Sequence, residues 1–481
     1  MRKALLAALA ATLLAPAGAL AGTRPLFTPG DPLAQRQYYL AQDHAFDAFG
    51  ATLPSLTPVR VAVIDSGIDS SHSEFRGRIA AMRSFVGGGA GTDDQGHGTF
   101  VAGEIAAAIN DQGIAGIAFP AQLVVAKIAR ADASISVRDE AAAIRWAVSR
   151  GARVINLSLG GLRHPFHADD SYSQVEANAI AYAYRHGAVL VAAVGNNDDA
   201  PRTPWPWASY PAALPHVIGV SALTQSGNVA SFSNRDRIYN DISAPGQNIF
   251  STLPLALTRD RPNCADQGYS DCGPDDYVHA SGTSFAAPQV TAAAAVLLAL
   301  RPSLRPEQVS NILERTATDV NASDGCNQCP LGRDQYSGWG RLDIAKAIAA
   351  LNGPLPQVDR LEPNDDAGSY AAHLGTSVRR VRATLDFWDD PIDVYRVRLV
   401  AGQRLRATLR GPAGVSTSLF LWRPGTVRVT ALRGRRLRAA QSIGPGSTHR
   451  LSFTVPATGL YYLEAKMTSR GAGPYTLTIT R

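Results

Sequence analysis

The stretch SGTSFAAPQVTAAAAVLLAL, residues 281–300, places a small polar turn directly before a long apolar run. From Phe285 to Leu300 the run is rich in alanine and carries no charge, so we expect a helix buried on most sides. Ser284 then lies at the N-terminus of this helix. A serine there either caps free backbone N–H groups or acts as a nucleophile beside donors that stabilise an oxyanion. The second role requires a base and a group that orients it, which the rest of the chain must supply.

Short β-branched runs alternate with alanine-rich runs of helical length between about residues 60 and 350. The continuous apolar runs are typical of strands covered on both faces; they are VRVAVID (59–65), LVVAKI (123–128), RVINLSL (153–159), AVLVAAVG (188–195) and HVIGVSAL (216–223). Helices are expected between them at 97–109, 139–151 and 174–187. The alternation predicts an α/β fold of three layers, with a parallel sheet between helices. Sites in such sheets form at the carboxyl ends of the strands.

Two residues in these segments could serve Ser284. Asp65 ends the first predicted strand, and His97 begins the first predicted helix. Each alone has an ordinary explanation, because aspartate is a common turn former and most histidines are not catalytic. Together the three side chains provide a carboxylate to orient an imidazole, an imidazole to take a proton, and a hydroxyl to attack.

The motifs around these residues resemble those of the subtilisin-like serine proteases, the subtilases. The matching segments are DSG at 65–67, HGT at 97–99 within GHGTFVAG, and GTSFAAP at 282–288, within a resemblance that covers about residues 31–351. Their order, Asp then His then Ser, is the order found in subtilisin. The resemblance implies a serine endopeptidase that hydrolyses peptide bonds through an acyl-enzyme. Asp65, His97 and Ser284 would be catalytic, and no cofactor would be required.

The resemblance also implies roles for two further segments. Asn196 in VAAVGNN (191–197) matches the oxyanion-hole asparagine, which would act together with the backbone N–H of Ser284. Ser158, Leu159 and Gly160 in NLSLGG (156–161) match the segment that pairs with extended substrate beside the S1 pocket. Without the resemblance, Asn196 would be read as a loop residue and 156–161 as the end of a core strand.

Metal binding and the specificity pocket are left open by the sequence. The loop AINDQGIAG (108–116) resembles a family calcium loop but is shorter, so structural calcium is possible while Asn110 and Asp111 could equally be turn residues. Trp205 and Trp207 follow Asn196 closely enough to wall the S1 pocket, although packing is the more common role of tryptophan.

The ends of the sequence predict export and a second domain. Residues 1–21 resemble a secretory signal peptide, with cleavage expected after Ala21, so we expect extracellular or periplasmic residence and no membrane span in the mature protein. The expected domains are a subtilisin-like peptidase domain at 22–353, a linker at 354–366 and a small all-β sandwich at 367–481. In an exported protein, disulfides are expected; three pairings are possible, and we prefer Cys264 with Cys272 and Cys326 with Cys329.

The C-terminal region resembles the bacterial pre-peptidase C-terminal domain in LEPNDD (361–366), DFWDDPIDVYRVRLVAGQRL (386–405) and TGLYYLEAKM (458–467). This resemblance implies an accessory for secretion, stability or surface binding. Asp366, Asp390 and Asp393 could bind calcium, but solvated turn carboxylates are the favoured interpretation.

Charge is divided unevenly along the chain. Residues 355–481 hold 19 basic and 9 acidic groups, a net charge of +10, whereas residues 22–354 hold 25 basic and 31 acidic groups, a net charge of −6. The basic tail either binds a polyanion or carries a solvated arginine-rich face, and the sequence favours the latter.

Two other functions remain possible: a catalytically silent subtilase fold that binds peptides, and a surface protein whose tail binds polyanions. The favoured hypothesis is a monomeric endopeptidase that acts on proteins or peptides and has no nucleic-acid partner.

Overall fold

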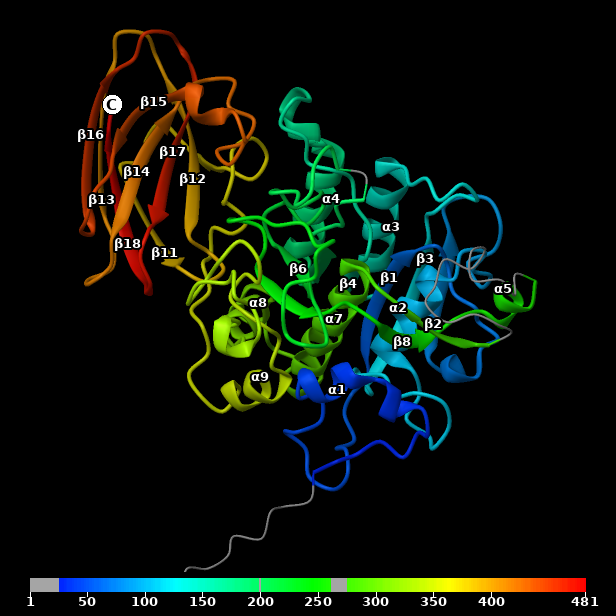
Figure 1. The fold of residues 1–481 in the computed structure, drawn as a ribbon. Coiled ribbons are helices and arrows are strands. Elements are labelled where there is room, and N and C mark those ends of the chain that lie inside the picture. The colour runs from blue at the N-terminus through cyan, green and yellow to red at the C-terminus, as the bar shows by residue number, and fades with distance from the viewer. Residues whose placement is uncertain (1–25, 199, 261–274) are drawn as a thin grey trace, which may run out of the picture.

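The computed structural model describes residues 26–198, 200–260 and 275–481, arranged as a large layered domain beside a smaller β-sandwich (Figure 1). The central sheet has seven parallel strands in the order β2-β3-β1-β4-β5-β6-β7. They are β1 (Val59–Asp65), β2 (Ile79–Ser84), β3 (Ala121–Lys127), β4 (Val154–Leu157), β5 (Val189–Ala193), β6 (Val217–Leu223) and β7 (Ile242–Pro245). A separate antiparallel pair consists of β8 (Ile249–Thr252) and β9 (Tyr277–Ala280).

Helices cover both faces of the sheet. The helices of this domain are α1 (Tyr38–Gln42), α2 (His97–Ala106), α3 (Val137–Ser149), α4 (Gln174–Arg185), α5 (Leu255–Asp260), α7 (Thr283–Leu300), α8 (Pro306–Thr316) and α9 (Ile344–Ala350). One apolar cluster joins α2, α7, α8 and α9 to one face of the sheet, and a second joins α3 and α4 to the other. The predicted three-layer α/β fold is confirmed.

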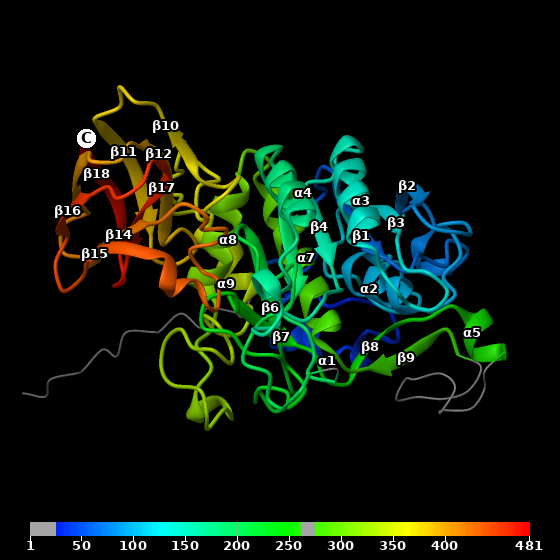
Figure 2. The same ribbon diagram turned by 90° about the horizontal axis from the view of Figure 1, so that it is seen from above.

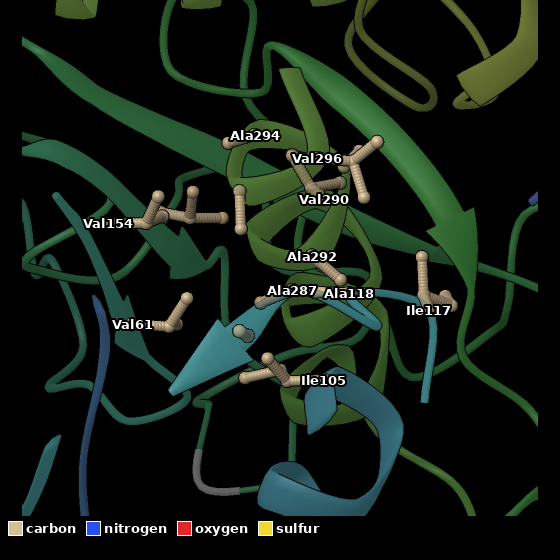
Figure 3. Close-up of a cluster of buried hydrophobic side chains, with 14 of the residues drawn as sticks. Val61, Ile105, Ile117, Ala118, Val154, Ala287, Val290, Ala292, Ala294 and Val296 are labelled. Atoms are coloured by element: carbon tan, nitrogen blue, oxygen red, sulfur yellow. The ribbon is translucent and has the colours of Figure 1, made fainter. Parts of the chain in front are cut away.

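α7 packs at the centre of the molecule because its side chains are small. Ala292 and Ala294 are fully buried, and both belong to the apolar cluster that also contains Val290 of the helix and Val61 and Val154 of the sheet (Figure 3). Within the described residues, α7 is the one helix long and apolar enough to span a membrane, but 89 % of it is buried inside the protein. Its hydrophobicity therefore serves the core.

The C-terminal region forms two packed sheets. One has the order β10-β12-β17-β14-β15 and the other β11-β18-β13-β16. The strands are β10 (Ala372–Leu374), β11 (Arg380–Asp386), β12 (Ile392–Leu399), β13 (Arg404–Arg410), β14 (Thr417–Trp422), β15 (Arg438–Ser442), β16 (Thr448–Thr454), β17 (Gly459–Met467) and β18 (Ala472–Thr480). Their inward side chains build one apolar core, as the predicted all-β sandwich requires.

The segment predicted as a linker, 354–366, is packed between the two domains. Asp359, Asn364 and Asp366 are at most 4 % exposed. Asp359 accepts a hydrogen bond from the backbone N–H of Thr384 in the sandwich, and its own N–H donates to Glu307 in α8. The connection between the domains is thus part of their interface.

Candidate active site

Ser284 lies in the first turn of α7. Its hydroxyl donates a hydrogen bond to the carbonyl oxygen of Ser158, 3.2 Å away, and the hydroxyl of Ser158 donates to the carbonyl oxygen of Ser284 at 2.7 Å. The second bond has a cause in the sequence. Pro288 has no N–H, so the carbonyl of Ser284 lacks its usual helical partner four residues later. Ser158 supplies the missing donor and joins the turn to the end of β4.

Asp65 and His97 meet at the carboxyl edge of the sheet. Nδ1 of His97 lies 2.8 Å from Oδ1 of Asp65, which also accepts the N–H of Ser66. The Asp65 side chain is 5 % exposed and that of His97 29 % exposed. Because the carboxylate accepts from Nδ1, the neutral imidazole keeps its lone pair on Nε2, where a base needs it.

His97 lies beside the start of α7, and its ring centroid is 5.4 Å from that of Phe285, the residue after Ser284. The hydroxyl of Ser284 is directed to the carbonyl of Ser158 rather than to the imidazole. The hydroxyl must therefore turn away from this carbonyl before it can give its proton to the imidazole. Catalytic hydrogen bonds often form only when substrate is bound.

Asp93 organises the turn that carries His97. This buried carboxylate accepts hydrogen bonds from the N–H of Gly96 at 2.9 Å, the N–H of Thr99 at 2.8 Å and the hydroxyl of Ser66 at 2.8 Å. It thus satisfies free N–H groups in the first turn of α2. The sequence interpretation missed Asp93, although the acidic pair just before GHGT was a visible signal.

The carboxylates around His97 control its charge. Burial lowers the pKa of His97, but the charge and hydrogen bond of Asp65 and the charge of Asp93 more than offset this, so the pKa lies above 6.5. An imidazolium formed during a reaction is therefore stabilised by the site.

Asn196 is held in one orientation by the residue that precedes Ser284. Its side-chain oxygen accepts the N–H of Thr283 at 3.0 Å and the hydroxyl of Thr283 at 2.9 Å. A backbone N–H must face an oxygen, so the amide orientation is settled and Nδ2 is available as a donor. Nδ2 lies 3.5 Å from the position that a Cβ on Gly282 would occupy, next to the turn that carries Ser284.

The predicted substrate segment follows β4. Ser158 is buried, Leu159 is half-buried and Gly160 is exposed. A Cβ on Gly160 would lie 2.7 Å from the carbonyl oxygen of Tyr210, so this position requires glycine. The segment is thus close-packed on one side and open on the other.

Trp205 has the packing role that the sequence left open. It is 2 % exposed and contacts the rings of His164 and Trp207 at centroid distances of 5.7 and 4.9 Å. Trp207 is half-buried.

Comparisons with known proteins identify the family of this chain. Residues 57–340 match the subtilase family, peptidase S8. The chain belongs to the subtilase family.

Among its curated relatives, fervidolysin from Fervidobacterium pennivorans is 37 % identical over 319 residues, which are 62 % of this chain and 41 % of the relative. Subtilisin DY from Bacillus licheniformis is 35 % identical over 290 residues, 60 % of this chain and 90 % of the relative. The cell wall-associated protease of Bacillus subtilis (strain 168) is 32 % identical over 342 residues, 67 % of this chain and 34 % of the relative. The chain thus spans less than half of two of these relatives.

Solved structures show the same fold. A protease of Pseudoalteromonas arctica PAMC 21717 superposes with a TM-score of 0.53 at 27 % identity, covering 67 % of this chain and 99 % of that one. A lanthipeptide protease superposes with a TM-score of 0.54 at 22 % identity, covering 68 % and 99 %.

The cysteines of this subtilase divide into two groups. Cys326 and Cys329 form a disulfide. Cys264 and Cys272 lie outside the described residues, so their predicted pairing stays a prediction.

In the subtilase domain, the loop 108–116, for which the sequence left calcium binding open, is held by a side chain from the N-terminal segment. Oδ1 of Asp31 accepts the N–H groups of Asn110 and Gln112 at 2.9 and 3.3 Å. Asp111 adopts a positive φ of 63°, as turn residues do. Within the described residues, the groups of side chains able to hold a metal ion lie elsewhere, between the subtilase domain and the sandwich.

A cluster of buried acidic side chains lies at this interface, and we call it the joint cluster. It consists of Asp359, Glu362, Asp390 and Asp393, whose donor oxygens all lie within 4.8 Å of one another. Burial first, and then the charges of neighbouring carboxylates, raise the pKa of Glu362, Asp390 and Asp393 well above the usual range.

The favoured interpretation of Asp366, Asp390 and Asp393 as solvated turn residues is wrong. They are 1 %, 4 % and 0 % exposed. Each packs where the two domains meet, a contact that a local sequence pattern does not reveal. Asp366 is neutralised by Arg428, whose Nε lies 2.9 Å from its carboxylate.

Proposed function

We propose that this subtilase is a serine endopeptidase that hydrolyses peptide bonds through an acyl-enzyme. Ser284 is the nucleophile, His97 the general base and then acid, and Asp65 the residue that orients the imidazole. The proposal is carried by one observation: the Asp65–His97 hydrogen bond lies beside the helix N-terminus that presents Ser284. The family membership of the chain supports it.

The reaction begins when the hydroxyl of Ser284 turns from the carbonyl of Ser158 to Nε2 of His97. The oxygen attacks the carbonyl carbon of the bound peptide as its proton passes to Nε2, and the resulting imidazolium is stabilised by Asp65. The oxyanion accepts hydrogen bonds from Nδ2 of Asn196 and from the N–H of Ser284. When the intermediate collapses, His97 gives the proton to the leaving amine. Water then attacks the acyl-enzyme by the same route and restores the hydroxyl of Ser284.

Substrate recognition follows from the open side of residues 158–160. An extended peptide would pair its backbone with Ser158, Leu159 and Gly160. We therefore propose that the substrates are proteins or peptides. We also propose that the enzyme is a monomer and that it is secreted after removal of residues 1–21. A cleavage-site profile on a peptide library and the mass of the secreted product test the substrate class and the processing.

A fluorophosphonate probe tests the catalytic assignment. The protein should be labelled, and Ser284→Ala and His97→Ala should each abolish labelling. Ser281→Ala is the matched control, because Ser281 lies in the same turn and accepts the N–H of Asn248 through its hydroxyl. If the folded protein is not labelled, or is labelled equally in Ser284→Ala, it is a peptide-binding subtilase fold without activity.

We also propose a structural calcium ion at the joint cluster, in addition to a catalytic reaction that needs no cofactor. The donors are oxygens, the ligands that calcium prefers. Asn364 is fully buried beside Asp393, and the oxygen of its side-chain amide and both oxygens of Asp390 lack a hydrogen-bond partner. Orphaned polar atoms around several carboxylates are costly unless a cation or protons neutralise them.

Thermal unfolding tests this second proposal. Calcium at 100 times its dissociation constant should stabilise the protein by about 2.7 kcal/mol. Asp393→Asn should remove the effect of calcium, whereas Asp132→Asn, at a fully exposed carboxylate, should keep it. If calcium and EDTA give the same unfolding temperature in the unaltered protein, the cluster does not bind the ion.

A further inference from the structure

In the sandwich domain, the acidic side chains point inward and the outer surface carries basic side chains. Residues 367–481 contain 18 basic and only 5 acidic side chains. Asp386, Asp390, Asp393 and Glu464 are each at most 7 % exposed, and the half-buried Asp389 accepts a hydrogen bond from Asn311 in α8. All five carboxylates are thus directed inward or towards the subtilase domain. The outer surface of the sandwich is left with positive charge alone.

Six of the arginines share one face of the sandwich, which we call the arginine face. They are Arg380 and Arg382 of β11, Arg404, Arg406 and Arg410 of β13, and Arg450 of β16, all exposed. The strands β16 and β18 lie on the side of the sandwich turned away from the subtilase domain in both views, and β13 lies there in Figure 1, whereas β11 contacts α8 through Asp386 at its end (Figures 1 and 2). The face is therefore open to a large partner.

Serine and threonine side chains lie opposite several of these arginines on the neighbouring strands. Arg406 lies opposite Ser452 on one neighbouring strand and opposite Thr480 on the other, and Arg410 lies opposite Thr448 and Thr476. On β11, Arg382 also lies opposite Thr476. Among the described residues of these four strands, Asp386 at the end of β11 is the one acidic residue in the outward register; it is 7 % exposed and forms an ion pair with Arg315 of α8, so it does not face solvent beside the arginines. Within the described part of the chain, no ion pair involves any of the six guanidinium groups.

The spacing of the arginines suits an extended ligand. Side chains two residues apart on a strand are about 6.8 Å apart, and adjacent strands are about 4.8 Å apart. The face thus offers a flat array of fork-shaped donors that match carboxylate, sulfate or phosphate groups, with hydroxyls between them. If the face served only solubility, exposed acidic residues would be expected among the arginines, because a surface of mixed charge is also soluble.

We propose that the arginine face binds an acidic polysaccharide. The outward positions of its strands carry no aromatic ring, so it lacks the stacking platform that single-stranded nucleic acids require. They carry no large apolar side chain either, and so offer nothing to insert into a lipid surface. Arginines for the acid groups and threonines for the sugar hydroxyls suit a charged polysaccharide chain. The sandwich would hold the protease on such a polymer without blocking its active site.

Binding to alginate tests the proposal, with the full chain carrying Ser284→Ala to prevent self-cleavage. The test variant is Arg404→Gln/Arg406→Gln/Arg410→Gln. Its matched control, Arg398→Gln/Arg423→Gln/Arg436→Gln, removes three cations that lie outside the arginine face. We expect the test variant to raise the dissociation constant at least tenfold and to flatten its salt dependence. The control should change the constant by less than threefold.

Other outcomes overturn the proposal. Equal losses in the two triple variants would mean that net charge, rather than the face, attracts the polymer. Tighter binding to single-stranded DNA, or to vesicles of phosphatidylglycerol, at the same salt concentration would mean that the partner belongs to another class. If the test variant unfolds, Arg406→Gln alone is compared with Arg423→Gln, and equal affinities of that pair reject the proposal.

Discussion

Substitution of Asn196, which two hydrogen bonds from Thr283 hold in place, tests its assignment to the oxyanion hole through the size of the loss in kcat. In subtilisin, loss of the asparagine donor costs about 2.7–4 kcal/mol of transition-state stabilisation, roughly 10²–10³ in kcat. We expect the same range for Asn196→Ala here, with KM nearly unchanged, because the donor would act only on the developing oxyanion.

Thr283→Val gives a graded version of this experiment. The substitution removes the 2.9 Å hydroxyl bond to Asn196 and keeps the 3.0 Å bond from the backbone N–H. A single hydrogen bond contributes about 0.5–1.5 kcal/mol, so kcat should fall by roughly 2- to 13-fold. Thr283→Ser keeps the hydroxyl and is the matched control.

Steady-state kinetics on a peptide that the protein cleaves measures both parameters. The order of kcat should be unaltered protein, then Thr283→Ser, then Thr283→Val, then Asn196→Ala. A kcat within threefold of the unaltered value in Asn196→Ala would refute the reasoning, since the amide would then lie outside the oxyanion site. A rise in KM alone would show that Asn196 binds substrate equally in the ground and transition states.

Three further predictions concern charge and packing. Because the pKa of His97 lies above 6.5, kcat/KM should fall as the pH drops through that raised pKa, and Asp93→Asn should move this acid limb to lower pH; a pH–rate profile measures both. Gly103→Ala would place a Cβ 2.3 Å from a side-chain oxygen of β8 and should destabilise the protein by about 1–3 kcal/mol in denaturant unfolding, whereas Gly87→Ala, in open space, should not. Arg428→Met would leave Asp366 buried without its partner and should cost about 3–5 kcal/mol in the same assay.

The layered fold could be predicted because its strands are continuous apolar runs. The expected strand 59–65 coincides with β1, and the other four predicted strands differ from the observed ones by at most two residues at each end. β2 was missed because its side chains are largely exposed or half-buried, so no apolar run marks it. The antiparallel pair β8 and β9 was missed because each strand has only four residues.

Interactions between distant segments limited what could be predicted of the site. Asp65 and His97 could be proposed from the sequence because each sits at the end of a recognisable element, β1 and α2. The bond between Ser158 and the carbonyl of Ser284 joins residues 126 positions apart, and its cause, the missing N–H of Pro288, becomes visible only when the helix is known to begin at Thr283. Asp93 was missed for a similar reason, since its role is to satisfy backbone N–H groups that the turn exposes.

The tail shows why net charge is a poor guide to a surface. Its sum of +10 over residues 355–481 favoured a solvated arginine-rich face over a site for a polyanion, without showing where the acidic side chains lie. In the structure, most of the nine acidic side chains of this region point inward or lie at the joint with the subtilase domain. They include Asp359, Glu362 and Asp366 of the connecting segment as well as the carboxylates of the sandwich itself. Carboxylates at the joint are paired there, Asp366 with Arg428 and Asp386 with Arg315, so they do little to offset the positive charge of the arginine face. The exposed surface of the sandwich therefore carries more positive charge than the net charge of the tail indicates, because acidic side chains that would offset it are buried or held at the contact with the subtilase domain.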